Sequence, residues 1–262
     1  MTARTPARAY GRHVYGLGVI ALAVVALILG SFLPGQPAPK DLPDRTVMAY
    51  AVAVFMLVAG AGLEWRRTAA WAAGALAAYY GVVVVVLMDG RVVARHWREF
   101  IAYSNTAEQL AIAAAGLIVF ASHARTGAGL AARLIRAGQV AFGVCAVLFG
   151  LAHFFYMNLT SPLVPRWLPP SQLFWGYATG VFHIAAGLAI LSGVRARLAA
   201  ILLTVMYAAF TPLVHMPLFL ADRHNHGNWV ENATNLVLTG AAWVVADSLA
   251  RPAKGVRRRG RG

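Results

Sequence analysis

The sequence predicts an all-α polytopic membrane protein with eight transmembrane helices, arranged as two parallel-repeated four-helix bundles. Three observations carry this prediction: the composition of the chain, a series of long apolar runs, and an internal repeat. Of the 262 residues, 60% are hydrophobic and only 12% are charged, whereas about a quarter of the residues in a soluble domain are charged. The composition therefore argues against an ordinary water-soluble enzyme.

Eight apolar runs are separated by Pro, Gly or Arg, and most approach the length of about 20 residues that a helix needs to cross a bilayer. None alternates polar and apolar residues as the strands of a membrane barrel do. The first run follows basic residues, as in a signal peptide, but its length and its place in the repeat favour an uncleaved helix. In chain order, the expected helices cover residues 14–33, 46–63, 69–88, 109–121, 135–156, 173–191, 198–220 and 230–246.

The basic residues predict the orientation of these helices. If the N-terminus is cytoplasmic, 16 Lys and Arg lie in the cytoplasm and 7 lie on the opposite face, as the positive-inside rule requires. Both termini are then inside, and loops 34–45, 89–104, 157–172 and 221–229 are outside. The net charge of +14 is thus explained by topology, with the basic C-terminal tail as an anchor on lipid headgroups. We expect a bacterial inner-membrane protein whose partner is the lipid bilayer and not nucleic acid.

The chain also contains an internal repeat. Residues 50–76 and 177–203 align without a gap at an offset of 127, with ten identities in 27 positions. Each unit has four expected helices, an even number, so both copies enter the membrane in the same sense. The two copies of an inverted repeat, which is common in transporters, enter the membrane in opposite senses. We expect a first, degenerate unit at residues 1–126 and a second unit at residues 127–262, and a transporter is the less favoured function.

Specific motifs occur in the second half. The segment GLAHF at 150–154 is followed by VPRWLPP at 164–170 and by GVFHIAAG at 180–187. Over about residues 136–248, and more weakly over 14–122, the chain resembles the DoxX-like membrane family. This resemblance implies a four-helix membrane unit that is often redox-associated and linked to quinone or sulfur metabolism. The family often has Glu in its second helix, where this chain has His183, so the role of that carboxylate is not carried over.

Six polar residues of the second half are expected to line a pocket that opens toward the outer face. Polar side chains inside a bilayer are costly, and they mark functional sites by default. Pro212 and Pro217 would also free helix carbonyls near the same mouth. A purely structural alternative stays open, in which the histidines bond helix carbonyls and the other residues cap a helix. The expected lining residues are His153, His215, Glu231, Asn232 and Asn235, with His183 at the floor.

The residues of this pocket leave two functions open. Histidines and a carboxylate can exchange protons with a quinone headgroup, which favours a redox- or quinone-associated subunit that docks with an oxidoreductase partner. The alternative is a non-catalytic protein that binds or scaffolds a lipid or another small hydrophobic molecule. No metal site is predicted, and haem or metal ligation is disfavoured because the three histidines lie at different depths on separate helices. The single Cys145 excludes an intramolecular disulfide. Whether the chain is an enzyme stays open.

Overall fold

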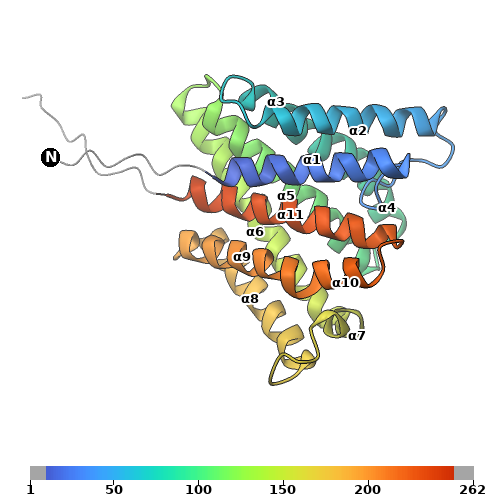
Figure 1. Ribbon diagram of the computed structural model, residues 1–262. Helices are drawn as coiled ribbons and strands as arrows, with labels where there is room; N and C mark the ends of the chain where they lie inside the picture. Colours follow the sequence, from blue (N-terminus) through green and yellow to red (C-terminus); the bar gives the residue numbers. More distant parts are fainter. Residues whose placement is uncertain (1–9, 251–262) are drawn as a thin grey trace, which may run out of the picture.

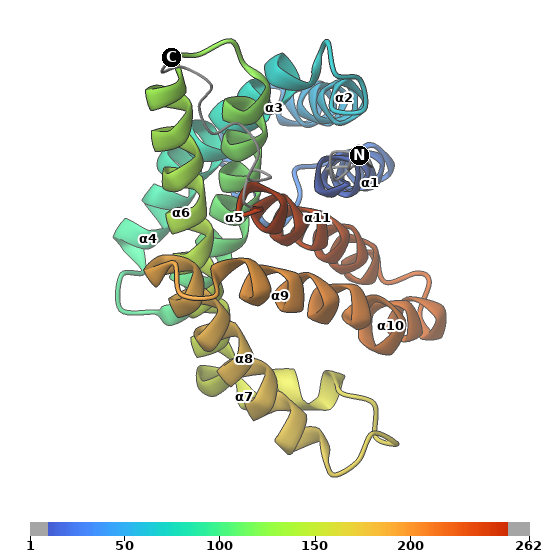
Figure 2. The same ribbon diagram turned by 90° about the vertical axis from the view of Figure 1, so that its left-hand side faces the viewer.

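Long helices account for nearly all of the structure. The computed structural model describes residues 10–250, and its helices pack side by side along most of their lengths (Figures 1 and 2). Within residues 10–250 there are no strands, and seven helices are long and apolar enough to cross a membrane. The chain is therefore a polytopic helical membrane protein, as its composition predicts. The N-terminal Arg4 and Arg8 and the basic C-terminal tail lie outside the described residues.

Two of the seven spans are each built from three consecutive helical segments. The third span runs through α3 (Ala69–Ala78), η1 (Tyr79–Asp89) and α4 (Gly90–Arg95), and the seventh runs through α9 (Ala196–Phe210), η3 (Thr211–His215) and α10 (Met216–Ala221). The other spans are α1 (Gly11–Leu29), α2 (Arg45–Gly62), α5 (Phe100–His123), α6 (Ala128–Phe155) and α8 (Gln172–Ser192). The short α7 (Met157–Thr160) and η2 (Ser161–Leu163) connect α6 to α8.

The last helix, α11 (His226–Ser248), is 23 residues long but is more polar than the other spans. Asn228, Glu231, Asn232 and Asn235 lie in its first three turns. It nevertheless packs along α1, α9 and α5 in the interior of the assembly (Figure 2). Seven spans thus satisfy the criteria of length and composition, and the eighth stays a prediction.

Several helices extend beyond the apolar runs that predict them. Helix α5 begins at Phe100 instead of residue 109, and α11 begins at His226 instead of residue 230. The third span continues to Arg95, so part of the expected outer loop 89–104 is helical. Apolar runs mark only the part of a helix that lies in hydrocarbon, whereas the backbone ladder continues through polar residues. The boundaries read from hydropathy are therefore too short.

The π-helical segment η3 explains how the seventh span accommodates Pro212. Proline has no N–H and interrupts the backbone ladder, and the freed carbonyls must be satisfied inside a membrane. The Asn235 side-chain amide of α11 donates to the Tyr207 carbonyl at 3.0 Å, and the Asn232 amide donates to the His215 carbonyl at 3.0 Å. Side chains of α11 thus supply hydrogen bonds to this irregular part of the seventh span.

Three helices of each half begin at matching positions. In the first half, α2, the third span and α5 begin at Arg45, Ala69 and Phe100. In the second half, α8 and α9 begin at Gln172 and Ala196, which are the positions that the repeat offset assigns to them. Helix α11 begins at His226, a single position before the one that the offset assigns. The first helices do not match, because α1 begins at Gly11 whereas α6 begins at Ala128.

Glycine pairs bring the first two helices of each half into backbone contact. A Cβ added to Gly60 of α2 would lie 3.1 Å from the carbonyl oxygen of Gly16 in α1. A Cβ added to Gly187 of α8 would lie 2.6 Å from the carbonyl oxygen of Gly143 in α6. Close backbone approach at small residues is typical of membrane helix pairs. The repeat offset relates Gly16 to Gly143 and Gly60 to Gly187, so both halves use the same contact.

The halves contact each other through their first and last helices. Helix α1 lies along α11, and α5 lies along α6 (Figures 1 and 2). A Cβ added to Gly11 of α1 would lie 2.6 Å from the Val244 nitrogen of α11, and one added to Gly138 of α6 would lie 2.8 Å from the Ala114 oxygen of α5. The first helix of each half thus packs on the last helix of the other half.

Candidate functional site

Three polar side chains from three helices meet inside the second half. The rings of His153 in α6 and His183 in α8 stack with their centroids 5.5 Å apart. The centroid of His183 lies 5.4 Å from that of Tyr207 in α9. His183 and Tyr207 are each only 3% exposed, and Phe149 packs edge-on against His183. We refer to His153, His183 and Tyr207 as the histidine–tyrosine cluster.

This cluster has hydrogen-bonding capacity that the protein does not use. His183 Nδ1 lies 2.9 Å from the Thr179 carbonyl oxygen, so Nδ1 carries the proton and Nε2 of the neutral ring is an acceptor. The Tyr207 hydroxyl and His153 Nδ1 are buried, and neither has a hydrogen-bond partner among residues 10–250. A buried polar atom without a partner costs about 1–3 kcal/mol. The arrangement therefore suits a bound polar group that accepts from Tyr207 and donates to a histidine.

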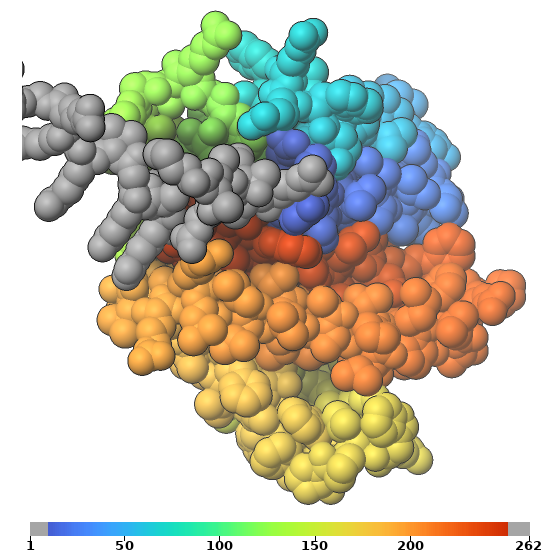
Figure 3. Space-filling model, turned by 60° about the vertical axis from the view of Figure 1, so that its left-hand side comes forward, coloured from blue at the N-terminus to red at the C-terminus, as the bar shows by residue number. Residues whose placement is uncertain are grey.

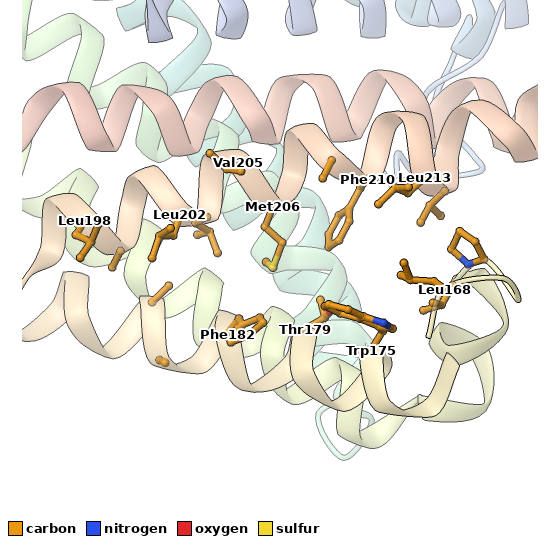
Figure 4. Close-up of a pocket in the computed structure, with 18 of the residues that line it drawn as sticks. Leu168, Trp175, Thr179, Phe182, Leu198, Leu202, Val205, Met206, Phe210 and Leu213 are labelled. Carbon is orange, nitrogen blue, oxygen red and sulfur yellow. The ribbon is translucent and has the colours of Figure 1, made fainter. Parts of the chain in front are cut away.

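An apolar groove lies between α8 and α9 and extends to the loop before α8 (Figures 3 and 4). Its volume is about 570 Å³. The side chains of Phe182 and Met206 line its middle, Leu168 and Trp175 lie toward one end, and Leu198 lies at the other. Arg195, the residue before α9, also lines the groove. We refer to this feature as the α8–α9 groove.

The groove and the histidine–tyrosine cluster share the same helix segments. Thr179 lines the groove, while its carbonyl accepts the His183 Nδ1 proton. Met206 lines the groove, and the next residue, Tyr207, belongs to the cluster. The groove and the cluster are therefore close along α8 and α9, which suits a molecule with an apolar chain and a polar headgroup.

The six residues predicted for an outer pocket occupy different environments. His153 and His183 are brought together in the cluster. Asn232 and Asn235 instead donate to the carbonyls of His215 and Tyr207 in the seventh span, a structural role that differs from the helix cap considered in the sequence analysis. None of the six lines the α8–α9 groove. Their role in binding a ligand stays a prediction.

His215 and Glu231 are less tightly integrated than the other four. His215 is half-buried in η3, and its contact with Asn232 is made by the backbone carbonyl. Glu231 is exposed at the start of α11, and its carboxylate accepts no hydrogen bond from residues 10–250. These two residues are therefore connected to the histidine–tyrosine cluster only indirectly, because the helical segments that carry them pack together.

Tyr207 was not expected from the sequence, although a signal for it exists. It lies just beyond the aligned segment 177–203, and the repeat offset relates it to Tyr80. Tyr80 is also buried, and its hydroxyl donates to Met56 Sδ at 3.1 Å. The same offset relates Met56 to His183. Extension of the repeat by one helical turn pairs Tyr207 with Tyr80, although only the structure shows that Tyr207 faces His183.

The corresponding place in the first half is filled by the chain itself. Gln36, from the loop between α1 and α2, is only 2% exposed, and its amide nitrogen lies 3.6 Å from Met56 Sδ. Leu163, the counterpart of Gln36 at the repeat offset, is 44% exposed in the loop between α6 and α8. The loop of the first half therefore enters its bundle, whereas the counterpart of Gln36 in the second half stays at the surface.

The structure thus defines a helical membrane protein whose second half combines a buried polar cluster with an apolar groove. Residues 142–246, which include both features almost completely, match a family model described as a domain of unknown function, DUF8561. No model of the DoxX-like family matches, so that resemblance stays an expectation. Neither the curated proteins nor the solved structures contain a match to the chain. Within residues 10–250, no group of three His, Cys, Asp or Glu side chains is placed to hold a metal ion.

Proposed function

We propose that the second half of this protein binds a small hydrophobic molecule with a polar headgroup, and that a membrane quinone is the preferred ligand. The observation that carries the proposal is the pair of unpartnered buried atoms, the Tyr207 hydroxyl and His153 Nδ1, beside His183. The hydroxyl can donate to a quinone carbonyl, and His183 Nε2 can accept from a quinol hydroxyl. The α8–α9 groove suits the apolar chain of such a molecule.

In this proposal the protein is a redox-associated membrane subunit. Histidine is the side chain that most readily exchanges protons near neutral pH. His183 and His153 therefore serve as proton donors and acceptors for the headgroup, and Tyr207 orients its carbonyl. An oxidoreductase partner on the same membrane supplies or receives the electrons. The exposed Glu231 and the half-buried His215 would lie on the path of protons to the outer face.

We further propose a duplicated architecture for the whole chain. Eight transmembrane helices form a degenerate unit at 1–126 and a ligand-binding unit at 127–262, similar to the DoxX-like four-helix unit. The matching helix starts and the two glycine pairs related by the repeat offset support this proposal. The distribution of Lys and Arg supports a bacterial inner-membrane location with both termini in the cytoplasm.

A second candidate function is the binding of a lipid or another hydrophobic molecule without redox chemistry. The α8–α9 groove favours it, because Arg195 is the one charged side chain that the described residues contribute to an otherwise almost entirely apolar lining. A groove of this kind can hold an alkyl chain whatever the headgroup is. The two functions differ in whether the histidine–tyrosine cluster recognises the ligand.

Two matched probes distinguish these functions. A decyl-substituted benzoquinone and decylbenzene carry the same chain on a six-membered ring, but only the quinone has carbonyl groups. Binding to the full-length protein in detergent can be followed by tryptophan fluorescence, since Trp175 lines the groove. We expect the quinone to bind at least about tenfold more tightly, the gain of one or two hydrogen bonds. Equal affinities would favour the second function, and no binding of either probe would contradict both.

A further inference from the structure

A second polar cluster joins the start of α1 to the ends of α2 and α5. One end of the Arg12 guanidinium lies 3.1 Å from His123 Nε2, and the other lies 3.1 Å from His13 Nε2. His13 Nδ1 lies 2.6 Å from a carboxylate oxygen of Glu64, which follows α2. Arg12 is only 8% exposed. We refer to Arg12, His13, Glu64 and His123 as the arginine–histidine cluster.

The contacts of this cluster fix where the protons are. A guanidinium only donates hydrogen bonds, so Nε2 of both His13 and His123 must accept and must be unprotonated. His123 Nδ1 lies 3.0 Å from the Val119 carbonyl oxygen and therefore donates to it. His13 Nδ1 likewise donates to Glu64. Both histidines are thus neutral, with the proton on Nδ1, when Arg12 is in place.

We infer that the arginine–histidine cluster is a proton-binding site in which a proton and Arg12 compete for the same ring nitrogens. A proton on Nε2 of either histidine turns that acceptor into a donor. It would then face a donor N–H of Arg12 at 3.1 Å, and the contact would break. Because imidazole gains a proton between about pH 5 and pH 8, Arg12 loses its buried partners as the pH falls through this range.

The charged groups around the cluster act in opposite directions. Glu64 contacts His13 at 2.6 Å and also attracts Arg12. Arg66 is a second cation near Arg12 and His123. On the α11 side, Asp247 accepts from the Gly11 backbone nitrogen at 3.0 Å and is itself influenced by Arg197. Proton binding therefore releases Arg12 while Asp247 still holds the first residue of α1.

The consequence is a change in the packing of the first turns of α1. At high pH, Arg12 connects α1 to the end of α5, and His13 connects it to the end of α2. Loss of the Arg12 contacts frees the start of α1 from α5. The neutral histidines stabilise the closed form above the histidine range, and this stabilisation is lost as the pH falls. For each proton taken up on opening, the opening constant rises up to about tenfold per pH unit.

Hydrogen exchange of the full-length protein in detergent tests this inference without any ligand. We expect amides at the start of α1 to lose at least about tenfold in protection between about pH 8 and about pH 5.5, after correction for intrinsic exchange rates. In the double variant His13→Gln, His123→Gln, the glutamine carbonyls can accept from Arg12 at either pH. This variant should keep its protection at low pH.

A matched control uses a histidine outside the cluster. His96 Nδ1 contacts the Glu99 carboxylate at 2.8 Å, but the pair is exposed and Arg12 does not contact it. His96→Gln should therefore leave the pH response of α1 unchanged. A wild-type protein without a pH response, or a double variant with the wild-type response, would overturn the inference. If the double variant does not fold, Arg12→Gln provides the second comparison, with low protection at both pH values as the expected result.

Discussion

The two halves of the molecule have comparable side chains at positions related by the repeat offset, but the contacts of these side chains differ. In the first half, the Tyr80 hydroxyl is satisfied by Met56, and Gln36 enters from a loop to fill the space. In the second half, Tyr207 faces His183 and its hydroxyl has no partner among residues 10–250. The same helix framework can therefore hold a buried tyrosine whose hydroxyl is bonded within the protein, or one whose hydroxyl could take a ligand as its partner.

The surfaces above these two centres differ in the same way. In the first half, Tyr79 packs edge-on against Phe55, with their ring centroids 5.4 Å apart. Their counterparts at the repeat offset, Met206 and Phe182, line the open α8–α9 groove instead. The aromatic pair of the first half thus fills a space that corresponds to the α8–α9 groove of the second half. Both differences support the proposal of a ligand site in the second half.

The largest effect is expected from the glycine pairs that both halves share. Gly187→Leu and Gly60→Leu would force side chains into backbone atoms that lie 2.6 and 3.1 Å from a Cβ. We expect each variant to lose about 3 kcal/mol of unfolding free energy, measured by denaturation in detergent. Gly129→Leu serves as a control, because no atom of the described residues lies within 4 Å of a Cβ at that position. If Gly60→Leu alone left the unfolding free energy unchanged, the glycine contacts of the two halves would not be equivalent.

The next effect concerns the hydrogen bond between Asn235 and the Tyr207 carbonyl in the second half. Asn235 is buried and donates to the Tyr207 carbonyl at 3.0 Å, next to Pro212 in the irregular segment η3. Asn235→Leu leaves that carbonyl without its side-chain donor and should cost about 1–3 kcal/mol of unfolding free energy. His226→Ala, an exposed change at the start of the same helix, should cost less. Equal stability of the two variants would show that η3 does not depend on α11.

The histidine–tyrosine cluster gives a smaller effect that is specific to the ligand. Tyr207→Phe removes only the unpartnered hydroxyl, so the folded protein should be as stable as the wild type or slightly more stable. Affinity for the decyl benzoquinone should fall by about five- to tenfold, the equivalent of one hydrogen bond. Tyr80→Phe is the matched change in the first half and should leave this affinity unchanged. The same loss in both variants would remove the distinction between the two centres.

The smallest effect comes from making the groove resemble the first half. Met206→Tyr introduces the residue found at the corresponding position of the first half, where Tyr79 packs on Phe55. An aromatic contact with Phe182 should stabilise the protein by about 0.5–1 kcal/mol, seen as a small rise in Tm. The same change should weaken binding of both decyl probes, because it fills space for the chain. Unchanged binding would mean that the ligand does not use the α8–α9 groove.

The sequence predicts the helices of this fold much better than it predicts the candidate site. Long apolar runs must be helical in a bilayer because every backbone group needs a partner. That argument does not apply to polar residues at the ends of helices, which belong to no apolar run. For this reason α5 and α11 are longer than expected. Helical spacing also cannot distinguish an asparagine that binds a ligand from one that bonds a neighbouring helix, as Asn235 does.

Two polar features could not be recognised from local patterns alone. Tyr207 lies in an apolar run and becomes notable only beside His183 from another helix. The arginine–histidine cluster brings together residues up to 111 positions apart, with Arg12 and His123 at opposite ends of the first half. Such sites depend on tertiary packing. The periodicity of apolar residues predicts which face of a helix is buried, but not which residues of other helices that face contacts.

The contacts between the halves pair the first helix of each half with the last helix of the other. Helix α1 packs on α11, α6 packs on α5, and α5 also contacts α11. On the duplication proposed above, a lone four-helix ancestor would have joined a second copy of itself through this one self-complementary surface, as in a twofold dimer. Such a dimer has two identical sites, and any substitution alters both. Fusion into a single chain removes that constraint, so one copy can close its centre and support the fold while the other keeps an opening.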